Sequence, residues 1–314
     1  MNGKLSPPVV FLPPKEFVLS RDALSRPYSL PEAQAYTRWL ATRHYENFSV
    51  VSLLLPRRLH QDFYNVYAFC RWADDLGDEV GDRAESERLL EWWGVELEAM
   101  YGGRASHPVF LALQGTVESH KLPIVPFQDL IRAFVQDQRV SRYRTYEELF
   151  EYCRYSANPV GRLVLYLCGY SDEARQRLSD STCTALQLAN FWQDVPVDLD
   201  KGRLYLPLDV LERLGCPVED VLERRVTPAF RAAMQEVVGV ARKLFLEGLP
   251  LARSMVDRRL AVDVELFSRG GMSILRKIEK QHFDVFSRRP VVSKSERAWL
   301  LISTMARAAF SKAA

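Results

Sequence analysis

Apolar residues recur at spacings of three and four along almost the whole chain after Pro31, which is the pattern of amphipathic helices. The alternation of apolar and polar positions that marks a half-buried strand is scarce. We therefore predict an all-α protein, with helices over residues 31–48, 56–80, 85–101, 107–120, 125–141, 145–169, 171–195, 227–248, 257–286 and 292–311.

The segment before these helices has a different character. Pro7, Pro8, Pro13 and Pro14 interrupt its short apolar run, so we interpret residues 1–30 as an irregular N-terminal arm. No unit of 20–50 residues repeats in the remainder. We therefore expect residues 31–314 to form one helical domain.

Charge and cysteine content narrow the function classes. The chain has 42 basic and 40 acidic side chains, and a net charge of +2 provides no field that would attract nucleic acid. Its five cysteines form no C-x-x-C pair, so neither a disulfide framework nor a zinc site is expected. The purely apolar runs are far shorter than the roughly 20 residues that span a bilayer. These features predict a cytoplasmic location.

Two stripes of polar side chains carry the candidate chemistry. In the predicted helix 56–80, Tyr67, Arg71, Asp74 and Asp78 fall within about 60° of one another around the helix axis. A second stripe, in and just beyond helix 171–195, consists of Gln187, Asn190, Asp194 and Asp198.

Paired carboxylates of this kind have two explanations. Each pair alone is typical of a solvated helix face. However, both pairs adjoin bulky apolar residues, Phe69 and Trp72 in one case and Phe191 and Trp192 in the other. If two acidic stripes face each other, a cation is required between them, and Mg²⁺ shared with substrate phosphates satisfies this requirement. The joint pattern therefore indicates a magnesium site for a phosphorylated ligand.

The same segments resemble the squalene/phytoene synthase family. The resemblance rests on Tyr67–Asp78, Tyr152–Gly161 and Gln187–Pro207, and it extends from about residue 44 into the C-terminal helices. Within the family, the stretches 44–48, 156–161, 190–194 and 266–271 look like those of the hydroxysqualene synthases of bacterial hopanoid and squalene pathways.

The resemblance implies a helical isoprenoid-synthase bundle with a central cavity, Mg²⁺ as cofactor and a prenyl diphosphate as substrate. It implies catalytic roles for Asp74, Asp78, Asp194, Asp198 and Tyr152, with the four aspartates as metal ligands and Asp75 as their support. It also implies that the substrate is bound by His44, Phe48, Tyr67, Arg71, Gln187, Asn190, Arg203 and Tyr205.

Two departures from the family pattern affect these expectations. Tyr45 and Asn47 stand where many relatives carry serines, which alters the expected phosphate contacts at that end. Pro196 lies between the two aspartates of the second stripe, where glycine is common. A proline there should kink the helix and change the direction of Asp198, so Asp194 is the safer ligand.

The implied reaction converts presqualene diphosphate and water to hydroxysqualene and diphosphate, without a need for NADPH. Aromatic faces would stabilise the carbocation, with Phe48, Phe69, Phe191 and Trp192 as candidates, although aromatics at helical spacing also suit a plain core. A head-to-head condensing synthase that makes presqualene diphosphate, squalene or phytoene would use the same ligands. A non-catalytic isoprenoid-binding or assembly protein is the alternative from another class.

An apolar substrate also implies peripheral contact with a membrane. The segment 257–286 combines basic residues with a strong apolar face and is the best candidate for this contact, although packing within the bundle explains its pattern better.

Overall fold

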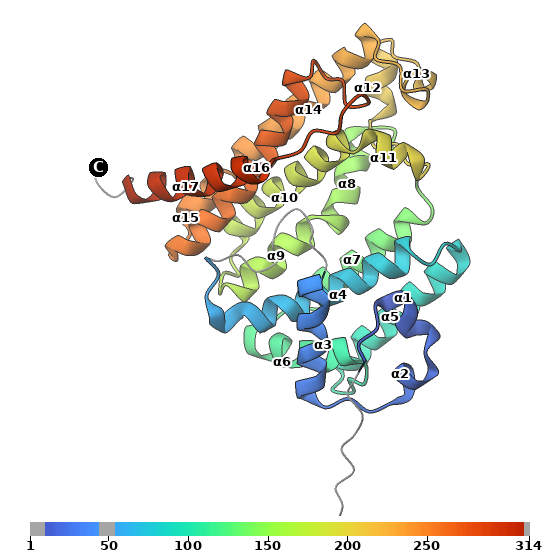
Figure 1. Cartoon of the computed structure of the whole chain (residues 1–314), viewed down its shortest axis with the longest axis vertical. Helices are drawn as coiled ribbons and strands as arrows, with labels where there is room; N and C mark the ends of the chain where they lie inside the picture. The colour runs from blue at the N-terminus through green and yellow to red at the C-terminus, as the bar shows by residue number, and fades with distance from the viewer. Residues whose placement is uncertain (1–9, 44–53, 311–314) are drawn as a thin grey trace, which may run out of the picture. The chain divides into compact units, whose positions relative to one another are not determined.

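The computed structural model describes residues 10–43 and 54–310, and over these residues every regular secondary-structure element is a helix (Figure 1). Its one β-type pairing there is an isolated bridge between Arg142 and Leu204. The predicted all-α class is therefore confirmed. Backbone contacts divide the chain into two compact units, the first over described residues 10–43 and 56–138 and the second over 54–55 and 139–310. The prediction of one domain over 31–314 stays a prediction.

The first unit contains α1 (Pro14–Leu19), α2 (Arg21–Ser25), α3 (Leu30–Arg43), η1 (Arg57–Leu59), α4 (His60–Asp78), α5 (Arg83–Tyr101), α6 (Pro108–His120) and α7 (Val125–Asp137). The second contains α8 (Tyr146–Ser156), α9 (Asn158–Leu167), α10 (Glu173–Gln193), α11 (Val195–Asp200), α12 (Leu208–Arg213), α13 (Val218–Leu222), α14 (Pro228–Gly248), α15 (Pro250–Ser254), α16 (Arg258–Lys280) and α17 (Lys294–Phe310).

The long helices lie where the apolar periodicity places them, and the differences concern short elements. Residues 14–25 of the expected irregular arm form α1 and α2, and Phe17 of α1 is buried among aromatic rings of the first unit. The segment 145–169 is two helices that meet at Ala157, as the Asn158–Pro159 step favours. Residues 201–226, which show no clear periodicity, contain α12 and α13, each begun by a proline at its N-cap.

A buried polar cluster fixes α4 between α3 and α6. The Asn65 amide nitrogen donates to the Ala112 carbonyl at 2.9 Å and to the Thr116 hydroxyl at 3.0 Å. Its amide oxygen accepts from the Thr37 hydroxyl at 2.7 Å. Because buried amides that lose a partner are costly, these bonds hold α4 in one rotational setting. Its polar stripe is thereby directed away from this contact.

The aromatic core beside α4 encloses a histidine. The ring of His107 lies 4.5 Å from that of Trp72, 5.0 Å from that of Trp93 and 4.9 Å from that of Phe17, measured between centroids. Its Nδ1 accepts a hydrogen bond from the Val109 amide and caps α6. Burial lowers the pKa of His107 from 6.5 to about 3, so the ring is neutral and acts as a packing group.

This burial predicts a specific acid sensitivity. Below about pH 6.5 the unfolded chain binds a proton at His107, whereas the folded protein does not. The neutral, buried ring therefore contributes fully to the free energy of unfolding above that pH, and the contribution is lost as the pH falls. Between pH 7 and 5 the free energy of unfolding should fall by about 2 kcal/mol more in the wild type than in His107→Asn. Urea denaturation at both pH values measures the difference. The surface variant His282→Asn should retain the wild-type slope, and equal slopes in all three proteins would contradict the assignment.

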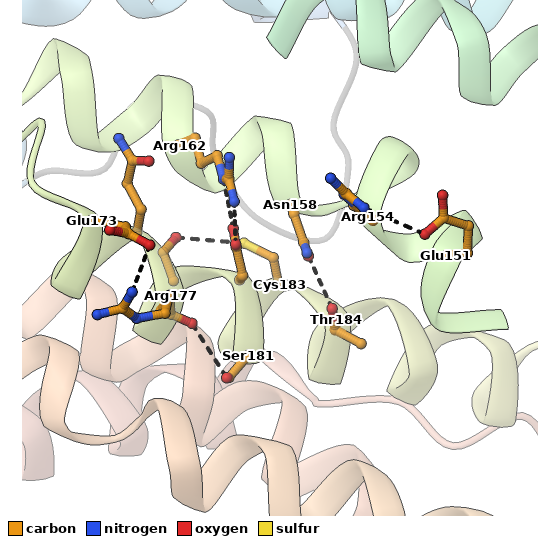
Figure 2. A network of polar contacts seen from close by, with 12 residues as sticks. Glu151, Arg154, Asn158, Arg162, Glu173, Arg177, Ser181, Cys183 and Thr184 are labelled. Atoms are coloured by element: carbon orange, nitrogen blue, oxygen red, sulfur yellow. Dashed lines mark hydrogen bonds and ion pairs between the residues drawn. The ribbon is translucent and has the colours of Figure 1, made fainter. Parts of the chain in front are cut away.

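In the second unit, α10 packs against α9, α14 and α16 (Figure 1). Figure 2 shows Asn158 and Arg162 of α9 directed toward α10, where Asn158 accepts from the Thr184 hydroxyl at 2.9 Å and Arg162 pairs with Asp180. Two glycines, one on α9 and one on α14, permit these helices to pack closely against α10. A Cβ on Gly161 would lie 2.5 Å from the Cys183 sulfur, and one on Gly248 of α14 would lie 3.1 Å from the Leu178 carbonyl oxygen.

Two glycines of α14 therefore make a matched pair. Gly248→Ala should destabilise the protein by about 1–3 kcal/mol, because the added methyl meets both the Thr182 hydroxyl and the α10 backbone. Gly239 has no atom near its position, so Gly239→Ala should stabilise by about 0.5–1 kcal/mol through helix propensity. Thermal or chemical unfolding of the two variants measures the effects. Effects of the same sign would refute the close approach of α10 and α14.

Candidate active site

The first aspartate stripe lies on one unbroken helix. Tyr67, Arg71, Asp74 and Asp78 all belong to α4 and occupy its less buried face, whereas Asp75 is buried beside them. The Arg71 guanidinium lies 2.6 Å from Asp75, 3.4 Å from Asp74 and 3.2 Å from Glu79. One arginine thus compensates three neighbouring carboxylates.

The charge state of Asp75 is set by its burial. Desolvation raises the pKa of Asp75, Arg71 opposes the rise, and Glu79 and Asp74 add to it, so that the pKa of Asp75 is about 7. The Asp75 carboxyl is therefore partly ionised at neutral pH, because Arg71 keeps its pKa from rising further. Arg71 has a structural task at this position in addition to any contact with a ligand.

We predict that Arg71→Met destabilises the protein by about 3 kcal/mol near pH 9, where Asp75 beside the arginine is ionised, and by under about 1 kcal/mol at pH 7, where the carboxyl is already partly protonated. The loss should shrink as pH falls and Asp75 takes up a proton. The double variant Arg71→Met/Asp75→Asn should recover most of the stability, since it removes the stranded charge. Arg83→Met, at an exposed pair with Glu87, is the control and should cost under about 0.5 kcal/mol. If the double variant unfolds as readily as the single one, the pair does not carry this energy.

The second stripe crosses a helix junction. Helix α10 ends at Gln193, Asp194 adopts a non-helical conformation, and α11 begins at Val195 with Pro196 in its first turn. The kink expected at Pro196 is therefore a complete break, and the proline occupies a position where its missing N–H costs nothing. The Asp198 amide still donates to the Asp194 carbonyl at 2.9 Å, so both residues remain one turn apart.

The charged partner of Asp194 is a residue that the sequence motifs did not indicate. The Arg289 guanidinium makes a two-pronged contact with both carboxylate oxygens, one of them at 2.9 Å. This hydrogen bonding and the charge of Asp194 raise the pKa of Arg289, and Asp198 adds to the effect. The Gln193 side chain holds the segment in place through the carbonyl of Pro290. The Arg288–Arg289 pair before a proline is the only local signal, and it has no periodic pattern.

An aromatic cluster adjoins this stripe. Phe191 stacks on Tyr205 with centroids 3.7 Å apart, and the Tyr152 ring lies 6.0 Å from that of Tyr205. Tyr143, a further member that the sequence motifs did not indicate, stacks on Tyr205 at 5.8 Å. The Leu204 amide donates to the Ser141 carbonyl, and the Leu208 amide donates to the Tyr143 carbonyl. These bonds join the two irregular backbone segments that carry Tyr143 and Tyr205.

The other predicted residues divide into three groups. Gln187 and Asn190 lie on α10, on the side that is less buried, and the Arg203 amide donates to the Asp198 carbonyl at 2.8 Å. Phe69 and Trp192 are completely buried in the cores of their units, so they act as packing residues. His44 and Phe48 lie outside the described residues.

The donor set fits magnesium in chemistry. Mg²⁺ prefers hard oxygen ligands. Two pairs of carboxylates supply such oxygens, each pair one helical turn apart: Asp74 with Asp78, and Asp194 with Asp198. Over residues 10–43 and 54–310, no three His, Cys, Asp or Glu side chains gather closely enough to hold a metal. Each unit contains one such pair, and a metal at either pair would draw its remaining ligands from substrate or water.

The match to known families is consistent with these features. Residues 41–296 match the squalene/phytoene synthase family model. The chain belongs to the squalene/phytoene synthase family. Its members process isoprenoid diphosphates, so the chain is assigned to an enzyme family.

Individual relatives represent more than one product class. The chain is 35% identical to phytoene synthase of Thermus thermophilus over 86% of this chain and 91% of the relative. It is 32% identical to hydroxysqualene synthase of Rhodopseudomonas palustris over 76% and 81%. The crystal structure of squalene synthase HpnC from Alicyclobacillus acidocaldarius is 47% identical, with a TM-score of 0.77, and the match covers 81% of this chain and 96% of that one. The isoprenoid-synthase helical fold is therefore confirmed.

Proposed function

We propose that the protein is a hydroxysqualene synthase, which converts presqualene diphosphate and water to hydroxysqualene, diphosphate and a proton. The observation that carries this proposal is the 47% identity to a squalene synthase over nearly all of that protein's length. The similarity to a hydroxysqualene synthase, together with the motif segments that resemble this subgroup, adds support.

In this proposal the polar stripes bind the diphosphate. Arg71 and Arg203 bind its oxygens, with Gln187, Asn190 and Tyr67 at the polar end of the site and His44 and Phe48 at its start. Asp74, Asp78, Asp194 and Asp198 hold Mg²⁺, which supplies Lewis-acid neutralisation of the leaving group's charge. The proposal keeps the expectation that residues 31–314 form one catalytic domain with a central cavity.

The aromatic cluster then acts on the cation. When the C–O bond breaks, its electron pair leaves with the diphosphate and the carbon skeleton becomes positive. The faces of Tyr152, Phe191 and Tyr205 can stabilise this charge by about 0.5–2 kcal/mol each in a dry site. A water oxygen forms the new C–O bond and loses a proton, so no reductant is consumed and NADPH is not needed.

A condensing synthase is the second candidate, and the similarity to a phytoene synthase favours it. It would join two prenyl diphosphates head to head with the same diphosphate-binding residues. The two candidates differ in the substrate and in the group that quenches the cation.

Product identification separates them. Incubation with presqualene diphosphate and Mg²⁺, without NADPH, should yield hydroxysqualene, and in labelled water the alcohol oxygen should carry the label. Farnesyl or geranylgeranyl diphosphate alone should remain unconsumed. Presqualene diphosphate, squalene or phytoene formed from these substrates would establish the condensing alternative, and no turnover of any substrate would support a non-catalytic binding or assembly protein.

We predict that Asp74→Asn and Asp194→Asn each lower kcat/KM for diphosphate release by about 100-fold or more, because each weakens charge stabilisation at the leaving group. If both aspartates serve one diphosphate, the double variant should be far less impaired than the product of the two effects. Glu173→Gln, at an exposed acid of α10 that pairs with Arg177, is the matched control and should keep wild-type activity. Fully multiplicative losses would indicate two independent sites.

A further inference from the structure

The segment that carries Arg289 begins at a helix packed within the bundle. Helix α16 contacts α10, α14, α15 and α17, and four of its apolar residues are buried: Leu260, Val262, Leu275 and Ile278. The basic and apolar pattern of 257–286, which also suited a membrane surface, therefore reflects packing. Among residues 10–43 and 54–310, no helix is long and apolar enough to cross a membrane. Residues 281–293, which we call the connector, lead from α16 to α17.

The first half of the connector is anchored by packing and by a local turn. Val285 is completely buried, and the Phe286 ring stacks on that of Phe230 of α14 with centroids 4.9 Å apart. The Asp284 carboxylate accepts hydrogen bonds from the Phe286 amide at 3.1 Å and from the Ser287 amide at 2.9 Å. This turn is thereby fixed against α14.

Hydrogen bonds also hold the backbone on either side of Arg289. The Gln281 side-chain amide donates to the Arg288 carbonyl at 3.3 Å, and the Gln193 side chain, at the end of α10, donates to the Pro290 carbonyl. Gln193 is buried, so the loss of its bond to Pro290 would strand a polar group. The base of the Arg289 side chain is therefore fixed beside Asp194, and the freedom that remains is in the side chain itself.

The head of the Arg289 side chain lies within reach of water. The side chains of Arg289 and Asp194 are 40% and 24% exposed, so the ion pair between them is only half-buried. The guanidinium engages both carboxylate oxygens of Asp194, which are the atoms that a metal would bind. An ion pair open to water is weaker than a fully desolvated one, so a competitor of higher charge can open it.

Mg²⁺ and the guanidinium suit the same carboxylate poorly at the same time. Both are cations, so sharing Asp194 would place them close together and each would repel the other. Mg²⁺ also demands a near-ideal octahedral arrangement of its ligands, whereas the arginine fork already sets the direction of both oxygens. Exchange of one cation for the other is therefore favoured over sharing.

We propose that Arg289 is an exchangeable counter-ion of Asp194, which neutralises this carboxylate in the metal-free protein and is displaced from it when Mg²⁺ binds. The inference rests on the proposed function only in that it takes Asp194 as a metal ligand. Arg289 thereby keeps the half-buried carboxylate from being stranded and lowers its affinity for metal. A permanent ion pair that aims Asp194 at the metal predicts the opposite, namely weaker metal binding when the arginine is removed.

Metal titration of the full-length protein tests the exchange. Mn²⁺, which accepts the same oxygen ligands as Mg²⁺, is the probe, and electron paramagnetic resonance measures its free fraction. The reference protein is Asp74→Asn/Asp78→Asn, so that binding reports the second stripe. In this background Arg289→Met should bind Mn²⁺ at least 5-fold more tightly than the reference. Arg289→Lys, which keeps the charge without the two-pronged contact, should lie between them.

The neighbouring arginine provides the matched control. Arg288 is exposed, and Arg288→Met removes the same charge one residue away, so it should stay within 2-fold of the reference. Equal tightening by Arg288→Met and Arg289→Met would assign the effect to net charge and refute the exchange. Unchanged, weaker or absent Mn²⁺ binding by Arg289→Met would overturn it as well.

Thermal unfolding of the same proteins gives a second measurement, which tolerates a loss of stability. Without metal, Arg289→Met should have a lower Tm than the reference, because it leaves the Asp194 carboxylate without its partner. Saturating MgCl₂ should raise the Tm of Arg289→Met by about 2–4 °C more than that of the reference, since no ion pair has to be broken. An equal or smaller rise would contradict the exchange. Neither measurement uses turnover, so conversion of presqualene diphosphate by the wild type tests the proposed function separately.

Discussion

A carboxylate that is partly withdrawn from water requires a cation, and this requirement organises both aspartate stripes. In the first unit Arg71 compensates Asp74, Asp75 and Glu79. In the second unit, the Arg289 guanidinium donates hydrogen bonds to both carboxylate oxygens of Asp194. The sequence pattern predicted a metal ion as the source of positive charge for both stripes. In the structure Arg71, itself a member of the first stripe, pairs with the neighbouring carboxylates, and Arg289 joins the second stripe. A metal at Asp194 would therefore share that carboxylate with Arg289 or displace it.

The helices that carry the aspartates are held by specific contacts with their neighbours. Asn65 ties α4 to α3 and α6 through bonds whose loss would strand buried amide groups. In the second unit, Gly161 and Gly248 let α9 and α14 approach α10 more closely than any larger residue would permit. Rigid support of this kind lets a site keep its geometry without strain in the ligating side chains.

The parts of the fold that local sequence specifies were predictable. The stripes on α4 and α10 follow from a period of 3.6 residues, and that period does not depend on the rest of the chain. Residues whose roles depend on distant partners were not predictable. Arg289 reaches Asp194 across 95 positions, and Tyr143 meets Tyr205 only because two irregular segments pair their backbones. Phe69 and Trp192 adjoin the aspartates in sequence, yet the helical turn directs them into the core.

The two aspartate pairs also differ in how firmly they are aimed. Asp74 and Asp78 lie on one continuous helix, so their separation is set by helical geometry alone. Asp194 and Asp198 lie on either side of a junction, and the direction of α11 depends on contacts outside the helix. Among these are the bond from the Arg203 amide to the Asp198 carbonyl and the pairing of Arg224 with Asp200. A change in the 201–207 segment would therefore alter the direction of Asp198 while leaving Asp194 in place.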